Sequence, residues 1–286
     1  MITARDISAI ATAERRIAYR TKGHSHGPLT RLMSPGDLGE LVKPFVFLDY
    51  FDFAGFGASD GGPVHPHSGI ATHTTLLEGS LVYGDSTGAT GTLHAGSVEW
   101  MQAGGGVWHG GTPIADRSIR GCQLWVALPP ELELAAAESH YVDGAAIPGD
   151  GGVRVLLGSY RAMPSPIPYP PAVTYLHVRL HDGERWTYAP DADHDVAWFA
   201  VGTGTLIVDG TPVRREMVVF EAGNAPITVL ARDEVDFVIA SAVKHPHPLV
   251  TGYYSVHTSQ KALDLGEAGI ERVATTMRLR PGVPLG

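Results

Sequence analysis

The chain has 286 residues, 44% of them hydrophobic, which is enough to bury a sizeable core and makes two domains the natural expectation. Its formal net charge of −9, without any run of Lys and Arg, disfavours direct binding to nucleic-acid phosphates. No stretch approaches the roughly 20 apolar residues of a membrane helix, and the N-terminus lacks the apolar block of a signal peptide, so we expect a cytoplasmic protein.

Glycine and proline divide the chain into short segments. There are 35 Gly and 21 Pro, and we find no long helix with heptad spacing. Cys122 is the only cysteine, so no internal disulfide can form, which fits a reducing compartment. It lies in the apolar run CQLWVAL and is expected in the core rather than as a catalytic thiol. This composition favours an all-β protein of short strands and tight turns.

Histidines at strand spacing stand out in the N-terminal half. His24 and His26 precede the first clear core strand and are predicted to lie in a solvated turn. His65 and His67 precede a glycine turn, and His109 follows the next pair of strands. Residues i and i+2 on a strand point to the same face, so the second pair can converge on one metal ion, with His109 on a strand beside it. The sequence therefore predicts one metal site in this half.

The remaining histidines are weaker candidates. His73 shares strand parity with the chosen pair, so it is either a fourth ligand or a core histidine with satisfied hydrogen bonds. His94 is expected at the surface in a turn. His245 and His247 follow a C-terminal strand and are interpreted, like the first pair, as a solvated turn.

Two other patterns suggest chemistry less strongly. The glycines at 104–106 are interpreted as a tight turn rather than a phosphate loop, because no Lys-Ser/Thr follows them. Asp49 with Asp52, and Glu78 with Glu99, are interpreted as turn and surface groups rather than as paired general acid–base catalysts. No catalytic residue is assigned.

The middle of the chain contains the main helical candidate, 129–141 (PPELELAAAESHY), which begins with prolines and contains good helix formers. The densest Gly and Pro stretches follow it, and we place a domain boundary there, between an N-terminal domain of residues 1–147 and a C-terminal domain of residues 148–286. The clearest strand candidates lie beyond this boundary: 153–157 (VRVLL), 173–180 (VTYLHVRL), 227–231 (ITVLA) and 236–243 (DFVIASAV).

An internal repeat relates the two halves. Residues 75–104 and 198–227 share a pattern about 125 residues apart, in which a strand reaches a glycine turn, at Gly79 or Gly204, and a second strand and a polar turn follow. Similar halves suggest two copies of one β-barrel unit.

The second copy lacks the histidines. Pro190 and Ala192 occupy the positions of the HxH pair, so we expect this copy to be metal-free and filled by side chains such as Trp198, Phe199 and Phe237.

Four segments in this order carry a resemblance to a known family: VKPFVFLDYFD, HPHSGIATHTTLLEGSLVYGDS, GSVEWMQAGGGVWHGGTP and GCQLWVALP. They are similar to the pirin family of bicupins, and the segment GYYSVHT at residues 252–258 is similar to that family's closing segment. The strong matches cover about residues 43 to 130, and their ordered combination is far more specific than a lone HxH.

The resemblance implies two antiparallel β-barrels of the cupin type, packed face to face, with one metal ion, usually iron, in the N-terminal barrel. The family's ligand pattern, HxH and a later His-x-Glu, falls on His65, His67 and His109, but Gly111 occupies the place of the carboxylate. The metal site therefore lacks the fourth ligand of the family.

Two further departures follow the HxH pair, where Ser68 and Ala71 replace the Arg and Glu that are common in the family. Three imidazoles still bind Fe, Zn, Ni, Mn or Cu, with water completing the coordination, and we expect iron. A metal-free relic is the alternative.

Two functions follow from the resemblance. The first is a metal-dependent oxygenase of the quercetin 2,3-dioxygenase type acting on a flavonol-like aromatic, although Gly111 removes the family's usual general base. The second is a non-enzymatic regulatory protein that binds a protein partner, with the metal as a possible redox switch. A small-molecule binding barrel without turnover is a third reading.

Overall fold

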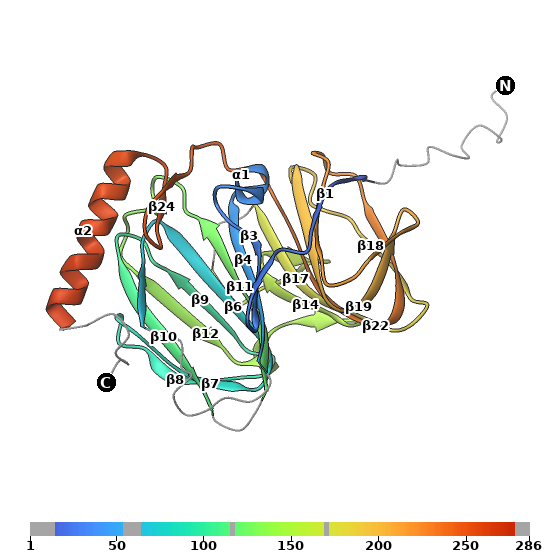
Figure 1. Cartoon of the computed structure of the whole chain (residues 1–286), viewed down its shortest axis with the longest axis horizontal. Helices are drawn as coiled ribbons and strands as arrows, with labels where there is room; N and C mark the ends of the chain where they lie inside the picture. The colour runs from blue at the N-terminus through green and yellow to red at the C-terminus, as the bar shows by residue number, and fades with distance from the viewer. Residues whose placement is uncertain (1–14, 54–63, 115–117, 169–171, 278–286) are drawn as a thin grey trace.

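The computed structural model of the chain describes residues 15–53, 64–114, 118–168 and 172–277, and most of its regular structure is β-strand (Figure 1). The all-β class is therefore confirmed. The four C-terminal strand candidates are confirmed as well, with the last two joined in a single long strand, β22 (Ile227–Ala242).

Two stacked sheets make up the N-terminal half. The larger has seven strands, in the spatial order β12 (Glu138–Val142), β9 (Val98–Gln102), β6 (Ile70–Glu78), β11 (Ile119–Ala127), β4 (Phe45–Phe53), β3 (Leu29–Met33) and β2 (His24–His26). The smaller has four, in the order β5 (His65–His67), β10 (Val107–Pro113), β7 (Ser80–Asp85) and β8 (Thr90–His94). A short helix, α1 (Leu38–Val42), precedes β4.

One nine-stranded sheet forms the C-terminal half. Its main path runs through β1 (Ile17–Thr21), β21 (Met217–Phe220), β19 (Val196–Val208), β22, β17 (Val173–Leu180), β14 (Val153–Leu157) and β13 (Gly149–Asp150), with β18 (Arg185–Tyr188) on β22 and β20 (Thr211–Val213) on β19. Outside it lie the 3₁₀ turn Gly144–Ala146 and the short pairs β15 (Ser159–Tyr160) with β16 (Met163–Pro164), and β23 (Val250–Thr251) with β24 (Val256–His257).

Both halves use a glycine bend at the repeat position. Gly79, with φ of +82°, separates β6 from β7 and carries the chain from the larger sheet to the smaller one. Gly204, with φ of +73°, bends β19 without ending it. The strands on either side of this bend therefore belong to one continuous sheet. Glycine adopts this left-handed conformation without steric cost, which explains why the repeat conserves it between the halves.

The strands form open sheets, where the sequence predicted closed barrels. Among the described residues of the N-terminal half, no strand of the four-stranded sheet pairs with a strand of the seven-stranded sheet. The chain passes from one sheet to the other at Gly79. The predicted face-to-face packing of the halves is present: the seven-stranded and nine-stranded sheets share one buried core, in which Phe45 and Trp198 meet edge to face at 5.5 Å.

Strand β19 shows how alternation divides the C-terminal core. Val196, Trp198 and Ala200 face the N-terminal half, and the intervening residues face the interior of their own half. Phe199 and Phe237 therefore fill that interior as predicted, whereas Trp198 lies on the opposite face, at the interface between the halves. The sequence pattern did not distinguish the two faces, because both are buried.

The helix predicted over 129–141 is wrong. Residues 130–134 form turns and the following segment is β12, which pairs with the edge of β9. The carboxylate of Glu133 is buried and accepts hydrogen bonds from the backbone and side chain of Thr258, at 2.7 and 2.8 Å. Tertiary hydrogen bonds therefore override the local helix propensity.

A long helix that the sequence did not indicate ends the described chain. α2 (Gln260–Met277) buries residues at helical spacing, including Leu263, Gly266 and Ile270, and covers the outer side of the four-stranded sheet (Figure 1). Trp108 on β10 donates a hydrogen bond from its indole nitrogen to the Ile270 carbonyl at 3.1 Å. Glycines on its buried face weaken the helical signal, which is why composition missed it. None of the helices in the described part of the chain is long and apolar enough to span a membrane.

The chain ends cross between the halves. β1 pairs with β21 of the C-terminal sheet, whereas α2 packs on β10 of the N-terminal half. The predicted boundary between residues 147 and 148 lies just before β13, and the division of the chain there stays a prediction.

His73 lies at the interface between the halves. It is fully buried, its Nε2 donates to the Leu156 carbonyl at 3.4 Å, and its ring meets Tyr175 edge to face at 5.2 Å. Burial lowers the pKa of His73 from 6.5 to about 4, partly offset by the bond to Leu156. The neutral form is therefore the one that fits the interface.

We predict that protonation of His73 destabilises the fold in mild acid. Because its pKa is lower in the folded chain than in the unfolded one, its contribution is complete above pH 6.5 and is lost as the pH falls towards 4, by about 3 kcal/mol in all. Urea unfolding at pH 7 and pH 4.5 should show a smaller loss for His73→Gln than for the wild type. The exposed His94→Gln is the control, and equal losses in all three proteins would contradict the assignment.

Candidate metal centre

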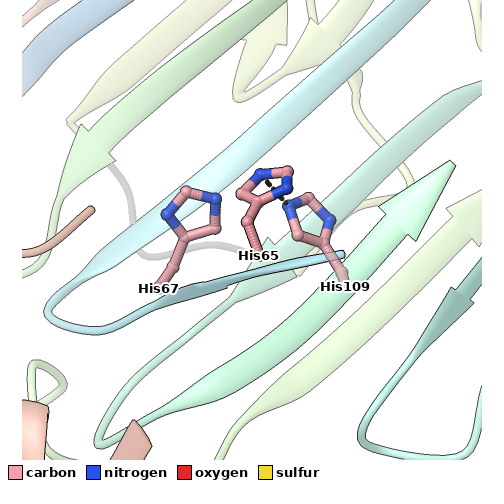
Figure 2. Close-up of side chains that lie close together, drawn as sticks. All are labelled: His65, His67 and His109. Carbon is pink, nitrogen blue, oxygen red and sulfur yellow. Dashed lines mark hydrogen bonds between the residues drawn. The ribbon is translucent and has the colours of Figure 1, made fainter. Parts of the chain in front are cut away.

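Three histidines converge where β5 and β10 pair. The antiparallel register places His65 opposite His109 and His67 opposite Val107, so all three imidazoles project from one face of the four-stranded sheet (Figure 2). The Nε2 atoms of His65 and His109 lie 3.1 Å apart, and one nitrogen from each of the three rings lies within 4.8 Å of the others. The structure thus brings together all three histidines that the sequence selected.

Hydrogen bonds on the far side of two rings set their tautomers. The Nδ1 atom of His67 donates to the Tyr254 carbonyl at 3.0 Å, and that of His109 donates to a Glu99 carboxylate oxygen at 3.1 Å. Each bond holds the proton on Nδ1 and leaves an Nε2 lone pair directed at the shared space. Among the described residues, the buried Nε2 of His67 finds no hydrogen-bond partner.

This arrangement fits a metal ion. Because the Nδ1 of His109 donates to Glu99, its Nε2 accepts a hydrogen bond from the Nε2 of His65 at 3.1 Å, and a metal ion would take the place of that single proton. Neutral imidazole is the form that binds metals. Burial, followed by the nearby His65 and His109, holds the pKa of His67 well below its ordinary value. All three residues are therefore suited to hold a divalent ion.

Glu99 lies in the site, although the sequence interpretation made it a surface group. It is on β9 of the opposite sheet, is 8% exposed, and accepts a hydrogen bond from the Thr74 hydroxyl at 2.7 Å. Burial acts to raise its pKa, but His109 and the hydrogen bonds from His109 and Thr74 outweigh burial and lower it. The signal was present in the sequence, since Glu99 lies among the apolar residues Val98, Trp100 and Met101 of β9.

The other acids differ from one another. Asp49 is buried and forms two hydrogen bonds of 2.9 Å with Arg31, so its assignment to the surface is wrong. Asp52 is exposed, and Glu78, also exposed, pairs with Arg120, as expected for surface groups.

A cavity of about 280 Å³ opens beside the histidines, between the two sheets of the N-terminal half. His65, His109, Glu99 and Gly111 line its inner end. Its walls are largely apolar and aromatic, with Phe51, Phe53, Leu81, Tyr83 and Ile119 among them, and Thr74 and Gln123 add polar groups. A small aromatic molecule matches this lining.

Gly111 follows His109 by two residues on β10 and faces the same cavity. Its φ is outside the left-handed region, and an added Cβ would lie 3.2 Å from the end of the flexible Leu81 side chain. The glycine is therefore not required by backbone conformation. The position simply lacks the carboxylate that the family pattern places there.

A second cavity of about 730 Å³ lies on the outer side of β5, under α2. Val64, Pro66, Trp108, Tyr254 and Ile270 line it, and His65 borders both cavities. Its lining is mostly apolar.

His73 does not join the three histidines, although strand parity suggested that it could. Gly69, with φ of +73°, lies between β5 and β6 and breaks the alternation, so Thr74 rather than His73 faces the site. Ser68 is also turned away, since its hydroxyl donates to Ser255 at 2.9 Å, and Ala71 packs in the core between the halves.

The remaining candidates lie elsewhere. His24 and His26 are exposed, but on the edge strand β2 rather than in a turn. His245 is buried and donates its backbone N–H to Lys43, so its assignment to a solvated turn is wrong. His94 is exposed, as predicted, but it is the last residue of strand β8 rather than part of the turn.

The interpretations of Cys122 and of the glycines at 104–106 are confirmed. Cys122 lies in the buried core, and the glycines form the turn before β10. Pro190 and Ala192 of the second half lie outside its strands, and the absence of metal from that half stays a prediction.

The chain is similar to known proteins over much of its length. The family model described as Pirin matches residues 28–126. A Pirin-like protein of Caulobacter vibrioides is 40% identical over 134 residues, which are 44% of this chain and 48% of that protein. A second Pirin-like protein of the same organism is 32% identical over 201 residues, covering 65% of this chain and 69% of that protein. A putative quercetin 2,3-dioxygenase of Pseudomonas aeruginosa is 28% identical over 258 residues, covering 83% of this chain and 88% of that protein.

Solved structures share the fold. A quercetin 2,3-dioxygenase from Acinetobacter baumannii superposes with a TM-score of 0.81 at 21% identity, covering 91% of this chain and 98% of that one. The bacterial pirin YhhW from Escherichia coli, in complex with nickel(II), superposes with a TM-score of 0.60 at 18% identity, covering 81% and 98%. The resemblance seen in the sequence is thus confirmed, and the chain belongs to the pirin family.

Proposed function

We propose that the chain binds one divalent metal ion through His65, His67 and His109 and oxygenates a small aromatic molecule held in the cavity beside them. The observation that carries the proposal is the convergence of three imidazoles on one point, where the buried Nε2 of His67 has no hydrogen-bond partner in the part of the chain that the structure describes. A buried acceptor of this kind is costly unless something binds it.

The cavity supports an aromatic substrate. Phe51, Phe53, Leu81 and Tyr83 can pack against a flat ring and exclude water, while Thr74 and Gln123 can hydrogen-bond to hydroxyl groups. Relatives named as quercetin 2,3-dioxygenases support the same substrate class.

The residues of the chain have separable roles in this proposal. A bound metal would polarise a substrate oxygen and lower the barrier to its reaction with O₂. His65, His67 and His109 hold the ion, and Tyr254 and Glu99 hold two of these rings in orientation through Nδ1. Gly111 has no side chain, so a bound ion would be open to substrate oxygens on the cavity side.

The metal we propose is iron, on the resemblance to the family. Imidazole also binds Zn, Ni, Mn and Cu, and the Escherichia coli relative was solved with nickel(II). A cytoplasmic location, expected from the sequence, is also part of the proposal.

We predict that His65→Ala and His67→Ala abolish metal binding, because each removes one of only three ligands. His65 is half-buried, so its replacement should leave the metal-free protein close to wild-type stability. Metal content after dialysis against Fe(II) or Zn(II), measured by mass spectrometry of the metals, tests this directly. His24→Ala, on the exposed strand β2, is the matched control and should keep its metal.

Retention of the metal in both ligand variants, or its loss from the control, would show that the site is elsewhere. The wild type should bind one ion per chain under excess metal. A second tightly bound ion that is lost in His194→Ala would contradict the expectation of a metal-free C-terminal half.

We predict that the iron-loaded protein consumes O₂ with quercetin or a simple catechol, and that His65→Ala does not. An oxygen electrode with product analysis measures this, and filling the cavity with Leu81→Trp should raise KM more than it lowers kcat, because it obstructs the wall rather than the metal. Stable metal binding with no turnover of either substrate would refute the oxygenase proposal. It would favour the alternative, a metal-dependent regulator that binds a protein partner.

A further inference from the structure

We propose that Glu99 compensates for the missing carboxylate at position 111 without binding the metal ion itself. It places a negative charge beside the site and orients the imidazole of His109, which is one of the proposed ligands. The inference rests on the proposed metal site and concerns a residue to which neither the sequence pattern nor the family pattern assigns a role.

Glu99 reaches the site from the sheet opposite the ligands. It lies on β9 of the seven-stranded sheet, and its Oε1 accepts the Nδ1 proton of His109, on β10 of the four-stranded sheet, at 3.1 Å. A carboxylate in this position fixes the tautomer and the ring plane of a ligating histidine and makes its Nε2 a stronger donor to the metal. His109 is the ligand nearest in sequence to Gly111.

The carboxylate is held in place on its other side. Its Oε2 accepts the Thr74 hydroxyl proton at 2.7 Å, and the Tyr141 hydroxyl lies 3.4 Å from Oε1 while donating to Asp85 at 2.8 Å. Tyr141 is itself stacked on Tyr83, with ring centroids 3.6 Å apart. Glu99 is thus a rigid hydrogen-bond acceptor, which orientation of a ligand requires.

Charge matching gives a second argument. Asp49 pairs with Arg31, and Glu78 with Arg120, whereas the ion-pair partner found for Glu99 among the described residues is the His109 imidazole. A buried carboxylate without a permanent cation is costly. A divalent ion held by three neutral imidazoles supplies the missing positive charge, and the carboxylate offsets the charge that the ligands leave uncompensated.

A substitution at position 111 can test whether Glu99 compensates for the missing carboxylate. Gly111 faces the same cavity, its φ lies outside the left-handed region, and the atoms nearest to an added Cβ belong to the end of the flexible Leu81 side chain. A glutamate there would point to the same face as His109. If Glu99 replaces a carboxylate of the ligand set, restoring that carboxylate should make Glu99 dispensable.

The test is Zn(II) affinity, by competition with a chromophoric chelator, for the wild type, Glu99→Gln, Gly111→Glu and the double variant. Glu99→Gln keeps the shape but not the charge, and should bind Zn(II) about ten to a hundred times more weakly. The double variant should regain at least tenfold of that loss. Glu78→Gln, which removes a carboxylate from a surface ion pair, is the matched control and should bind as the wild type does.

The melting temperatures of the metal-free proteins show whether Glu99 orients His109 or instead stabilises the fold. Glu99→Gln should melt within a few degrees of the wild type, because it exchanges a buried charge for an isosteric amide. Thr74→Val, which removes only the hydroxyl that anchors Glu99, should weaken Zn(II) binding in the same direction by a smaller factor. This second variant tests the inference if Glu99→Gln does not fold.

Wild-type affinity in Glu99→Gln, or weakened binding that Gly111→Glu does not recover, would overturn the inference and leave the three-histidine site intact. A wild-type chain that binds no Zn(II) or Fe(II) would instead refute the proposed function, and this inference with it.

Discussion

The pairing of β5 with β10 is the interaction on which the rest of the site depends. β5 has only three residues, yet it places His65 opposite His109, with their Nε2 atoms 3.1 Å apart, and puts His67 on the same face of the sheet. A shift of one residue in this register would turn His65 and His67 towards α2 and away from the cavity. The alternation is visible in the residues between them, since Pro66 and Trp108 face α2.

Several distant segments hold this short strand in place. Ser68 bonds Ser255 next to β24, and the Tyr254 carbonyl, from a residue with φ of +59°, accepts the His67 proton. The glycine turn at 104–106 packs closely against α2. The C-terminal segment therefore completes the N-terminal site from the outside, and the two halves of the chain are not independent in this respect.

Several buried carboxylates are paired with basic groups. Asp49 lies against Arg31, and Asp236 lies against His177 and Arg179. These carboxylates have a basic group beside them, which offsets the cost of taking them out of water, whereas the buried Asp85 accepts hydrogen bonds from Thr87 and Tyr141 instead. Glu99 pairs with an imidazole, and a divalent ion at the three histidines would add the positive charge that a neutral imidazole lacks.

The sequence by itself determined the β class, the glycine bends at Gly79 and Gly204, the family, and the three histidines that converge. These are local properties: residue type, spacing along a strand, and ordered motifs. Only the tertiary structure decided which face of a doubly buried strand a side chain occupies, as for Trp198, and that Gly69 turns His73 away from the site. It also decided that residues 138–142 form a strand, and that Glu99 meets His109 from another sheet. Those outcomes depend on contacts between segments far apart in the chain, and a strand's own pattern cannot show which segment lies across from it.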